Sequence, residues 1–326
     1  MQINGSILVT GASGFIGNQL IQLLQDQYPD IELIGTDIKK PDTQTTSPNY
    51  TFLTCDIRDG ANLKKIINEN KVSAIVHLAS VVTPPPGMAR ETLYDIDVNG
   101  TRHLLEAAVE HNVEHFIVTS SGAAYGYHRD NADWLKEDDP LRGDLSFSYA
   151  YHKREIECLL ALYQKKHPQL KQLILRPGTV LGKTVNNQIT ELFKKPVLMG
   201  IFGHKSPFVF IWDQDLVKII AKGLEEKIQG IFNVAGDGAI STRDIASLLG
   251  KPYLPIPAFL VKAILAVFKP LNLSQYGPEQ VKFLMYRPVL LNSKLKEVFG
   301  YIPSYTSKEA FIAWMEAQNN NQRVST

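Results

Sequence analysis

The sequence predicts an α/β fold built on a doubly wound parallel sheet, with a smaller C-terminal lobe. Three observations predict it. Short apolar runs alternate with amphipathic helical patterns at the spacing of β–α–β units. The first run is followed at once by glycines at three-residue spacing, and the second run ends in an acidic residue. The 326 residues are enough for one large α/β unit and a smaller lobe.

The first predicted strand, residues 7–9, is a continuous apolar run. Gly11, Gly14 and Gly17 follow it, and apolar residues over 20–24 then predict a helix. Gly11 permits a sharp turn, Gly14 lets the backbone approach a pyrophosphate, and Gly17 lets the helix pack against the strand. The helix N-terminus offers N–H groups to the same anion. This pattern is typical of a Rossmann-type dinucleotide site, with a purely structural βα turn as the alternative.

The second predicted strand, residues 31–37, ends in Asp37, 20 residues after Gly17. A carboxylate at this point accepts hydrogen bonds from the adenosine ribose hydroxyls and repels a 2′-phosphate. We therefore predict that NAD is preferred over NADP. Lys39 and Lys40 follow directly, either as solvated loop residues or as partners for a 2′-phosphate.

The alternation of strands and helices continues along the chain. Further strands are predicted at residues 50–55, 73–80, 115–121, 173–177, 208–211 and 231–234, and helices at 64–70, 90–112, 148–166 and 256–268. Residues 1–176, with 207–235 returning to them, are expected to form the dinucleotide-binding domain. Residues 177–206 and 236–318 are expected to form a substrate-binding lobe, and 319–326 a flexible tail.

Composition narrows the possible partners and location. The net charge is +1 with no basic block, which argues against nucleic acid. Cys55 and Cys158 are too few for a disulfide framework or a metal cluster, and they suit a reducing cytoplasm. The first strand begins too early for a signal peptide to precede it. The apolar helix at 256–268 is shorter than the roughly 20 residues that span a bilayer. We expect a cytoplasmic protein with a small-molecule substrate, no metal and no transmembrane segment.

The strongest catalytic signal is a tyrosine–lysine pair. Tyr149 and Lys153 are four residues apart in the predicted helix 148–166, so they share one face. A phenol is a poor base at neutral pH because its ordinary pKa is about 10, but a nearby ammonium favours the phenolate. Tyr149 is thus expected to exchange a proton with a secondary alcohol during hydride transfer. Lys153 is also expected to hold the nicotinamide ribose, whereas Tyr151 has the wrong helical phase.

With these motifs in place, the sequence resembles the extended short-chain dehydrogenase/reductase family, in its NAD-dependent epimerase/dehydratase group, over residues 5–318. The resemblance rests on the glycine-rich turn and on the motifs at 56–59, 77–80, 99–101, 119–126, 149–153 and 176–178. It implies that Ser121 hydrogen-bonds the reacting oxygen, and that the chain forms a homodimer. The NAD-binding set that it implies is Gly11, Ser13, Gly14, Phe15, Ile16, Gly17, Asp37, Asp56, Ile57, Leu78, Ala79, Ser80, Asn99, Tyr149, Lys153 and Pro177.

The chain departs from the family pattern where the substrate reacts. Dehydratases of the family carry Asp-Glu directly after the residue equivalent to Ser121, whereas this chain has Gly122 and Ala123. Neither residue can serve as an acid or a base, which argues against dehydration. The family's nucleotide-sugar epimerases usually carry an asparagine after the sixth strand that binds the substrate diphosphate, and this chain has Pro-Gly-Thr there, at residues 177–179. They also carry an arginine where this chain has Phe208.

The substrate contacts implied for this chain are Ser121, Thr179 and Arg287, of which Arg287 matches a family arginine that can hold a phosphate. The apolar stretch 256–268 resembles the lobe of the family's 3β-hydroxysteroid-dehydrogenase and reductase branch. We therefore expect an NAD-dependent oxidoreductase or epimerase acting on a secondary alcohol or ketone, with a hydrophobic substrate. The alternatives are a nucleotide-sugar 4-epimerase of the UDP-glucose type and a non-catalytic NAD(P)-sensing regulator.

Overall fold

The computed structural model describes residues 5–41, 47–85, 87–271 and 277–324, with side chains described up to 320. The chain divides into two compact units. The first comprises residues 1–121, 152–176 and 213–232, and the second comprises 122–151, 177–212 and 233–326. Residues 122–151, 207–212 and 233–235 thus group with the second unit, although the sequence pattern predicts them in the first.

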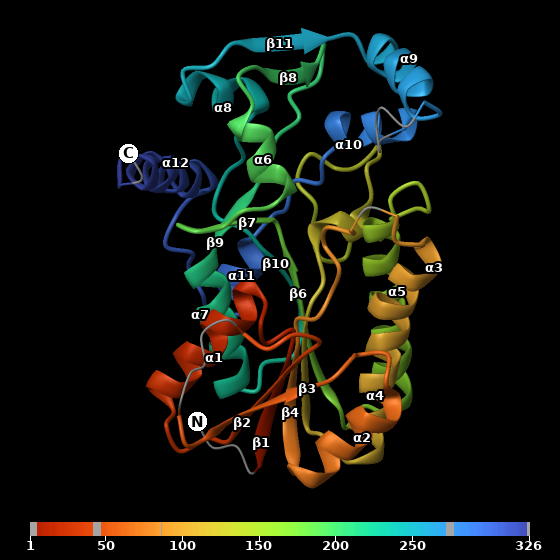
Figure 1. Ribbon diagram of the computed structural model, residues 1–326, viewed down its shortest axis with the longest axis vertical. Coiled ribbons are helices and arrows are strands. Elements are labelled where there is room, and N and C mark those ends of the chain that lie inside the picture. The colour runs from red at the N-terminus through yellow and green to blue at the C-terminus, as the bar shows by residue number, and fades with distance from the viewer. Residues whose placement is uncertain (1–4, 42–46, 86, 272–276, 325–326) are drawn as a thin grey trace. The chain divides into compact units, whose positions relative to one another are not determined.

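A seven-stranded sheet forms the centre of the fold, in the order β10-β6-β5-β4-β1-β2-β3 (Figure 1). Its strands are β1 (Ser6–Thr10), β2 (Leu33–Asp37), β3 (Tyr50–Thr54), β4 (Val72–His77), β5 (His115–Thr119), β6 (Lys171–Pro177) and β10 (Gly230–Val234). Neighbouring strands from β3 through β6 run parallel. The strand order reverses between β1 and β4, which is the point where open α/β sheets bind their ligands. The predicted doubly wound parallel sheet is confirmed.

Helices of the first unit cover both faces of this sheet (Figure 1). One face carries α1 (Phe15–Gln27) and α7 (Asp213–Glu225), and the other carries α2 (Gly60–Glu69), α4 (Gly100–Glu110) and α5 (Ser148–Lys166). A π-helical turn, η1 (Asp95–Asn99), connects the short helix α3 (Arg90–Tyr94) to α4. The helix predicted over 90–112 is therefore continuous but changes its winding in the middle.

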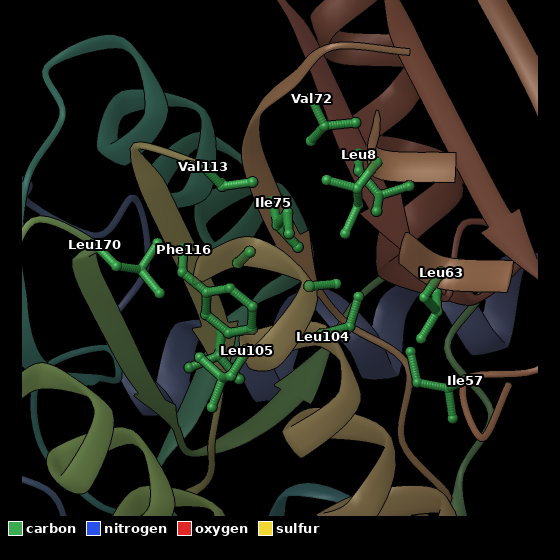
Figure 2. Packing of buried hydrophobic residues seen from close by; sticks show 14 of the residues in the cluster. Leu8, Ile57, Leu63, Val72, Ile75, Leu104, Leu105, Val113, Phe116 and Leu170 are labelled. Carbon is green, nitrogen blue, oxygen red and sulfur yellow. The ribbon is translucent and has the colours of Figure 1, made fainter. Parts of the chain in front are cut away.

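The core of the first unit lies between the sheet and the helices α2, α4 and α5. Leu104 and Leu105 of α4 are completely buried and belong to the same cluster as Phe116 of β5 and Leu8 of β1 (Figure 2). Ala108 is equally buried. These α4 residues therefore pack within the chain, and they do not form an apolar surface patch for a partner.

The second unit has two small parallel sheets and its own aromatic core. β7 (Thr179–Leu181) pairs with β9 (Phe210–Trp212), and β8 (Leu198–Ile201) pairs with β11 (Tyr253–Ile256). The core gathers Phe193, Phe208, Phe210, Phe311 and Trp314. Its helices are α6 (Gln188–Lys194), α8 (Thr242–Leu248), α9 (Ala258–Phe268), α10 (Val281–Met285), α11 (Ser293–Glu297) and α12 (Ser307–Val324), with 3-10 turns η2 (Gly122–Tyr125) and η3 (Pro278–Gln280). Residues 319–324, predicted as part of a flexible tail, continue α12.

Candidate active site

The glycine-rich turn after β1 is shaped by close backbone contacts. Gly11 has φ +71°, and a Cβ there would lie 2.7 Å from the backbone nitrogen of Ala79. A Cβ on Gly17 would lie 2.2 Å from the carbonyl oxygen of Gly11. Helix α1 begins at Phe15 with Gly14 as its N-cap, which offers no side-chain hydrogen bond, and its first turn contains no acid. Because no side chain caps α1, the N–H groups of its first turn are available to an anion such as a dinucleotide phosphate.

The predicted ribose-binding acid lies beside this turn. The backbone N–H of Ser13 donates to Asp37 Oδ2 at 3.2 Å, and the backbone N–H of Ile38 donates to Asp37 Oδ1 at 2.7 Å. The hydroxyl of Ser13 donates to the carbonyl of Lys39 at 2.6 Å. Phe15 and Ile16 form the first turn of α1. The residues around Asp37 thus fit an adenosine ribose next to a pyrophosphate.

Residues implied to surround the adenine come from the loop after β3. Asp56 pairs with Arg58 at 2.6 Å, and this hydrogen-bonded guanidinium lowers the pKa of the Asp56 carboxyl. Ile57 packs so closely on η1–α4 that a Cβ on Gly100 would lie 2.7 Å from its Cγ2. The amide of Asn99 donates to Asp95 within the helix at 2.9 Å. Glycine at position 100 is therefore required by the position of Ile57.

Lys153 lies at the carboxyl end of β5, together with Ser121. Its Nζ donates to the carbonyl of Thr119 at 3.0 Å, and its side chain is buried. Ser121 comes two residues after Thr119 in the same chain segment. Tyr149 lies on α5 one helical turn before Lys153. The first unit therefore places Lys153 and Ser121 at one strand end, and the helix fixes Tyr149 on the same face as Lys153.

A buried ion pair binds the hydroxyl of Ser120, the residue before Ser121. Arg176 Nη2 lies 2.6 Å from Glu157 Oε2, and both side chains are almost fully buried. The hydroxyl of Ser120 donates to Glu157 Oε1 at 2.5 Å. This network holds α5 against β5 and β6, so Ser120 has a structural role. Ser121, which is only half-buried, remains the candidate that faces substrate.

A second buried pair, which no sequence pattern predicts, lies next to Lys153. Asp97 Oδ2 lies 2.9 Å from His152 Nδ1, and both residues are buried. Asp97 Oδ1 accepts hydrogen bonds from the Ser80 hydroxyl and the Val81 N–H, both at 3.0 Å. Burial raises the pKa of Asp97, but the His152 hydrogen bond and the positive charge of Lys153 together hold it below its ordinary value. Asp97 thus remains ionised beside the ammonium.

His77, at the end of β4, connects this pair to β1. The hydroxyl of Thr101 donates to the carbonyl of Asp97 at 2.6 Å, so it accepts from His77 Nε2 at 3.0 Å. His77 Nδ1 then accepts from the hydroxyl of Thr10 at 2.8 Å. Burial lowers the pKa of His77 to about 3, with a further contribution from the charge of Lys153. The imidazole is therefore neutral at physiological pH. Leu78 follows it directly, and its N–H donates to the Thr10 carbonyl at 3.1 Å.

In the second unit, an arginine rests on two aromatic rings. The guanidinium carbon of Arg287 lies 3.6 Å from the ring centroid of Phe208 and 4.7 Å from that of Phe283. Its Nε has no hydrogen-bond partner within the described part of the chain. Burial lowers the pKa of Arg287 to about 9, so the group is still a cation at pH 7. Its Nη1 donates to the carbonyl of Ser206 at 3.4 Å. This arrangement offers a positive charge to an anion.

Tyr127 lies close enough to both Arg287 and Tyr149 to interact electrostatically with each of them. Burial raises the pKa of the Tyr127 phenol, with interaction with Tyr149 raising it further and the positive charge of Arg287 lowering it. The Tyr127 ring packs on Phe147, two residues before Tyr149, and on Phe283, with centroid separations of 4.6 and 5.2 Å. Arg287 therefore lies in the same aromatic neighbourhood as the first turn of α5.

Other predicted positions have simpler surroundings. Pro177 ends β6 and Thr179 begins β7, where its N–H donates to the carbonyl of Val209 at 3.0 Å.

A Cβ on Gly122 would lie 3.0 Å from two methyl carbons of Leu290. The position after Ser121 is therefore filled by a neighbour, which agrees with the absence of an acidic side chain there. The Tyr125 hydroxyl donates to Lys136 O at 2.8 Å and is fully buried, as a structural tyrosine is.

Comparison of the sequence with known families gives one match that covers most of the chain. The model of the NAD dependent epimerase/dehydratase family matches residues 7–235. An uncharacterized protein of Mycobacterium tuberculosis is 24% identical over 308 residues, which cover 94% of this chain and 82% of that protein. The human dTDP-D-glucose 4,6-dehydratase is 30% identical over 185 residues, which cover 54% of this chain and 51% of the human protein.

Solved structures share the fold along the whole chain. The UDP-glucose 4-epimerase of Thermotoga maritima, solved with UDP-glucose, aligns with a TM-score of 0.75 at 18% identity, covering 97% of this chain and 99% of that one. The dTDP-glucose 4,6-dehydratase of Bacillus anthracis, solved in complex with NAD, aligns with a TM-score of 0.74 at 20% identity, covering 98% of both chains. At these identities the likeness establishes the fold.

Proposed function

The chain belongs to the NAD dependent epimerase/dehydratase family, and from this premise we propose that it is an NAD-dependent oxidoreductase or epimerase that acts on a secondary alcohol or ketone through Ser121, Tyr149 and Lys153. The observation that carries this proposal is the position of Lys153. Its ammonium bonds to Thr119, at the strand end where Ser121 lies and one helical turn from Tyr149.

The three side chains have distinct tasks in this reaction. Bound NAD supplies the hydride acceptor for the carbinol carbon. Tyr149 Oη takes the hydroxyl proton as the carbonyl forms, and returns it when the carbonyl is reduced. Ser121 Oγ donates a hydrogen bond to the same substrate oxygen. Lys153 stabilises the phenolate by its charge and binds the nicotinamide ribose.

Arg287 supports a substrate that carries a phosphate. A cation on two aromatic rings, with no acidic partner among the described residues, is suited to a charge-assisted contact with a phosphate oxygen. Three of the proteins compared above, the human and Bacillus anthracis dehydratases and the Thermotoga maritima epimerase, are named for dTDP-glucose or UDP-glucose. We therefore favour a nucleotide-sugar as substrate, with Thr179 as a further contact. Because Gly122 and Ala123 lack acid and base groups, epimerisation or dehydrogenation is favoured over dehydration.

A hydrophobic alcohol, the substrate expected from the sequence, is the second candidate. It is favoured by the aromatic cluster of Tyr127, Phe147 and Phe283, and by Phe208 in place of the arginine of many epimerases. Each Å2 of apolar substrate surface buried on such rings is worth about 25 cal/mol. A 3β-hydroxysteroid is a representative probe of this class.

The catalytic assignment is tested by comparing Tyr149→Phe with Tyr151→Phe. Tyr149→Phe is expected to reduce turnover about a hundredfold or more, because the proton-transfer group is lost while the ring remains. NAD affinity should stay within about twofold of the wild type, since the proton-transfer hydroxyl adds little to ground-state binding. Substrates are UDP-glucose, dTDP-glucose and a 3β-hydroxysteroid, with both NADH release and the configuration of the product measured. Near-normal turnover by Tyr149→Phe would exclude Tyr149 as the proton-transfer residue.

The two substrate classes are separated by UDP binding. If UDP binds at micromolar concentration and Arg287→Gln removes that binding while Arg129→Gln, an exposed control, does not, a nucleotide-sugar is supported. If UDP does not bind and the steroid is oxidised, the hydrophobic alcohol is supported. NAD binding without turnover of either class would instead support the NAD-sensing regulator.

A further inference from the structure

Helix α9 of the second unit is apolar and has little packing. Its 11 residues include no acid, and Lys262 is its only charged residue. Ala258, Val261 and Leu265 are the partly buried residues, and they form one stripe along the helix. The opposite face exposes Phe259, 74% of whose surface is accessible, and Val267, with 57%. None of the residues in α9 is fully buried.

The exposed apolar surface continues onto the small sheet that precedes α9. Met199 of β8 and Leu254 of β11 are register partners, and both are exposed, Met199 to 63%. Phe202, just after β8, is 69% exposed, and its N–H donates to the carbonyl of Ile256 at the end of β11. Only Pro257 separates β11 from α9, and Figure 1 shows α9 beside the end of β11. Large exposed side chains therefore form one surface from β8 to α9, which we call the apolar edge. Surfaces of this kind mark interaction sites.

The two segments that carry the apolar edge, residues 192–212 and 245–278, contain only basic charged residues, and Glu191, Asp244 and Glu279 border them. Residues 245–278 contain three lysines, Lys251, Lys262 and Lys269, and no aspartate or glutamate. Residues 192–212 contain Lys194, Lys195 and Lys205, and again no acid. Lys269 is paired with Glu279 at 2.6 Å, and Lys194 with Glu191 at 2.6 Å. Lys262 borders the exposed face of α9 and has no ion-pair partner within the described ranges.

We propose that the apolar edge, β8–β11 and α9, binds the surface of an anionic lipid bilayer. An apolar helix face bordered by lysine is the pattern of a segment that lies in the membrane interface. The lysines complement anionic headgroups, each contributing to binding near the surface. A two-fold interface through α9 would place Lys262 against a second helix that contains no acid, so the charge of Lys262 favours anionic lipid over self-association.

This binding would be peripheral. No described helix combines the length and hydrophobicity that crossing a bilayer requires. Phe259 and Val267 would enter the boundary between headgroups and acyl chains, with Met199 and Phe202 beside them. The proposal does not depend on the substrate, and it holds for either of the two substrate classes discussed above.

The test is co-sedimentation of the full chain with vesicles of phosphatidylcholine alone and of phosphatidylcholine with phosphatidylglycerol. Phe259→Ser with Val267→Ser should weaken binding to the anionic vesicles at least about a hundredfold, because two exposed apolar anchors are lost. The matched control is Val298→Ser with Ile302→Ser, two equally exposed apolar residues of the same unit, which should leave binding unchanged. NAD binding and melting temperature should be unaffected in both, since the substituted side chains are exposed.

Charge is tested with a second pair of variants. Lys262→Glu should weaken binding to the anionic vesicles about tenfold, and Lys308→Glu, an exposed lysine outside the apolar edge, should not. High salt should reduce the advantage of anionic over neutral vesicles. Absence of sedimentation, or equal binding by the Phe259/Val267 variant, would overturn the proposal. So would an oligomer in light scattering that this variant alone dissociates, because the edge would then be covered by a second copy.

Discussion

Among individual residues, the Asp97–His152 pair was the least predictable part of the candidate site. Its two members are 55 residues apart in the sequence, and His152 is next to Lys153 on α5. An aspartate in a helix and a histidine beside a predicted catalytic lysine are each ordinary, so no pattern joins them. The π-helical turn that presents Asp97 also has no sequence signal comparable to a glycine or a proline. By contrast, the sequence alone predicts the tyrosine–lysine pair, because Tyr149 and Lys153 are four residues apart in one helix. It also predicts Asp37, which ends the second strand 20 residues after Gly17.

We expect Asp97→Asn to destabilise the protein strongly. The substitution keeps the size of the side chain but removes the charge that faces both His152 and Lys153 in a buried position. Breaking a buried pair in this way costs about 3 kcal/mol of unfolding free energy. Urea unfolding at neutral pH measures this loss. The control is Asp95→Asn, at a partly buried position on the same turn, which should cost less than about 1 kcal/mol. Equal losses for the two variants would mean that the pair with His152 contributes nothing specific.

Among the structural elements, the glycine-rich turn and the strands of the main sheet were predicted well from the sequence. Their apolar runs are continuous and the turn glycines are required by contacts of the backbone itself. The β8–β11 sheet was not predicted. Pro255 lies within β11 opposite Gly200 of β8, and both residues are disfavoured in strands. The stacking of Arg287 on Phe208 was not predictable, because the two residues lie far apart in the sequence, although the sequence indicates each as a candidate substrate-site position.

Two alanine substitutions in the turn should have separable effects. Gly17→Ala should lower the unfolding free energy by about 1–3 kcal/mol, because its Cβ would collide with the carbonyl of Gly11. Gly14→Ala should change stability much less, since the nearest atom would be 3.1 Å away. It should instead weaken NAD binding, because the glycine-rich turn predicts that the pyrophosphate approaches the backbone at this position. Thermal unfolding and NAD titration of the two variants measure both quantities. A Gly14→Ala variant with unchanged NAD affinity would show that the pyrophosphate does not approach this position.

For the molecule as a whole, two buried histidines make stability depend on pH. Burial lowers the pKa of His77 to about 3 and that of His115 to about 4, whereas both are near 6.5 in the unfolded chain. The unfolded state therefore binds more protons below pH 6.5. Their contribution is fully present above that pH and is lost as the pH falls toward the folded-state values. We expect unfolding free energy to fall by about 1.4 kcal/mol per pH unit for each histidine below about pH 6.

Urea unfolding between pH 7 and pH 5 tests this dependence. His115→Asn should reduce the slope of unfolding free energy against pH by about 1.4 kcal/mol per pH unit, the contribution of one histidine. The substitution also changes the hydrogen bond to the carbonyl of Ile228. A wild-type stability that does not change over this range would contradict the assignment of both imidazoles as neutral.

The homodimer suggested by family resemblance stays a prediction for the whole molecule. The fully buried residues Leu104, Leu105 and Ala108 cannot form its interface, so any pairing through α4 or α5 would use the outward faces of these helices. Light scattering at micromolar concentration measures the assembly state. A dimer that survives the Phe259/Val267 substitution would be formed through a surface other than the apolar edge.

The hydrogen-bond chain through His77 also gives the protein an internal spectroscopic probe. The Nε2 proton is held between a completely enclosed imidazole and the Thr101 hydroxyl, whose own proton is committed to the Asp97 carbonyl. Such a proton exchanges with water only when the surrounding structure opens. Its downfield NMR resonance would therefore report, at a single atom, whether β1, β4 and α4 remain docked. Broadening of this signal on addition of NAD would show that NAD binding changes the motion of these three elements, without any label attached to the protein.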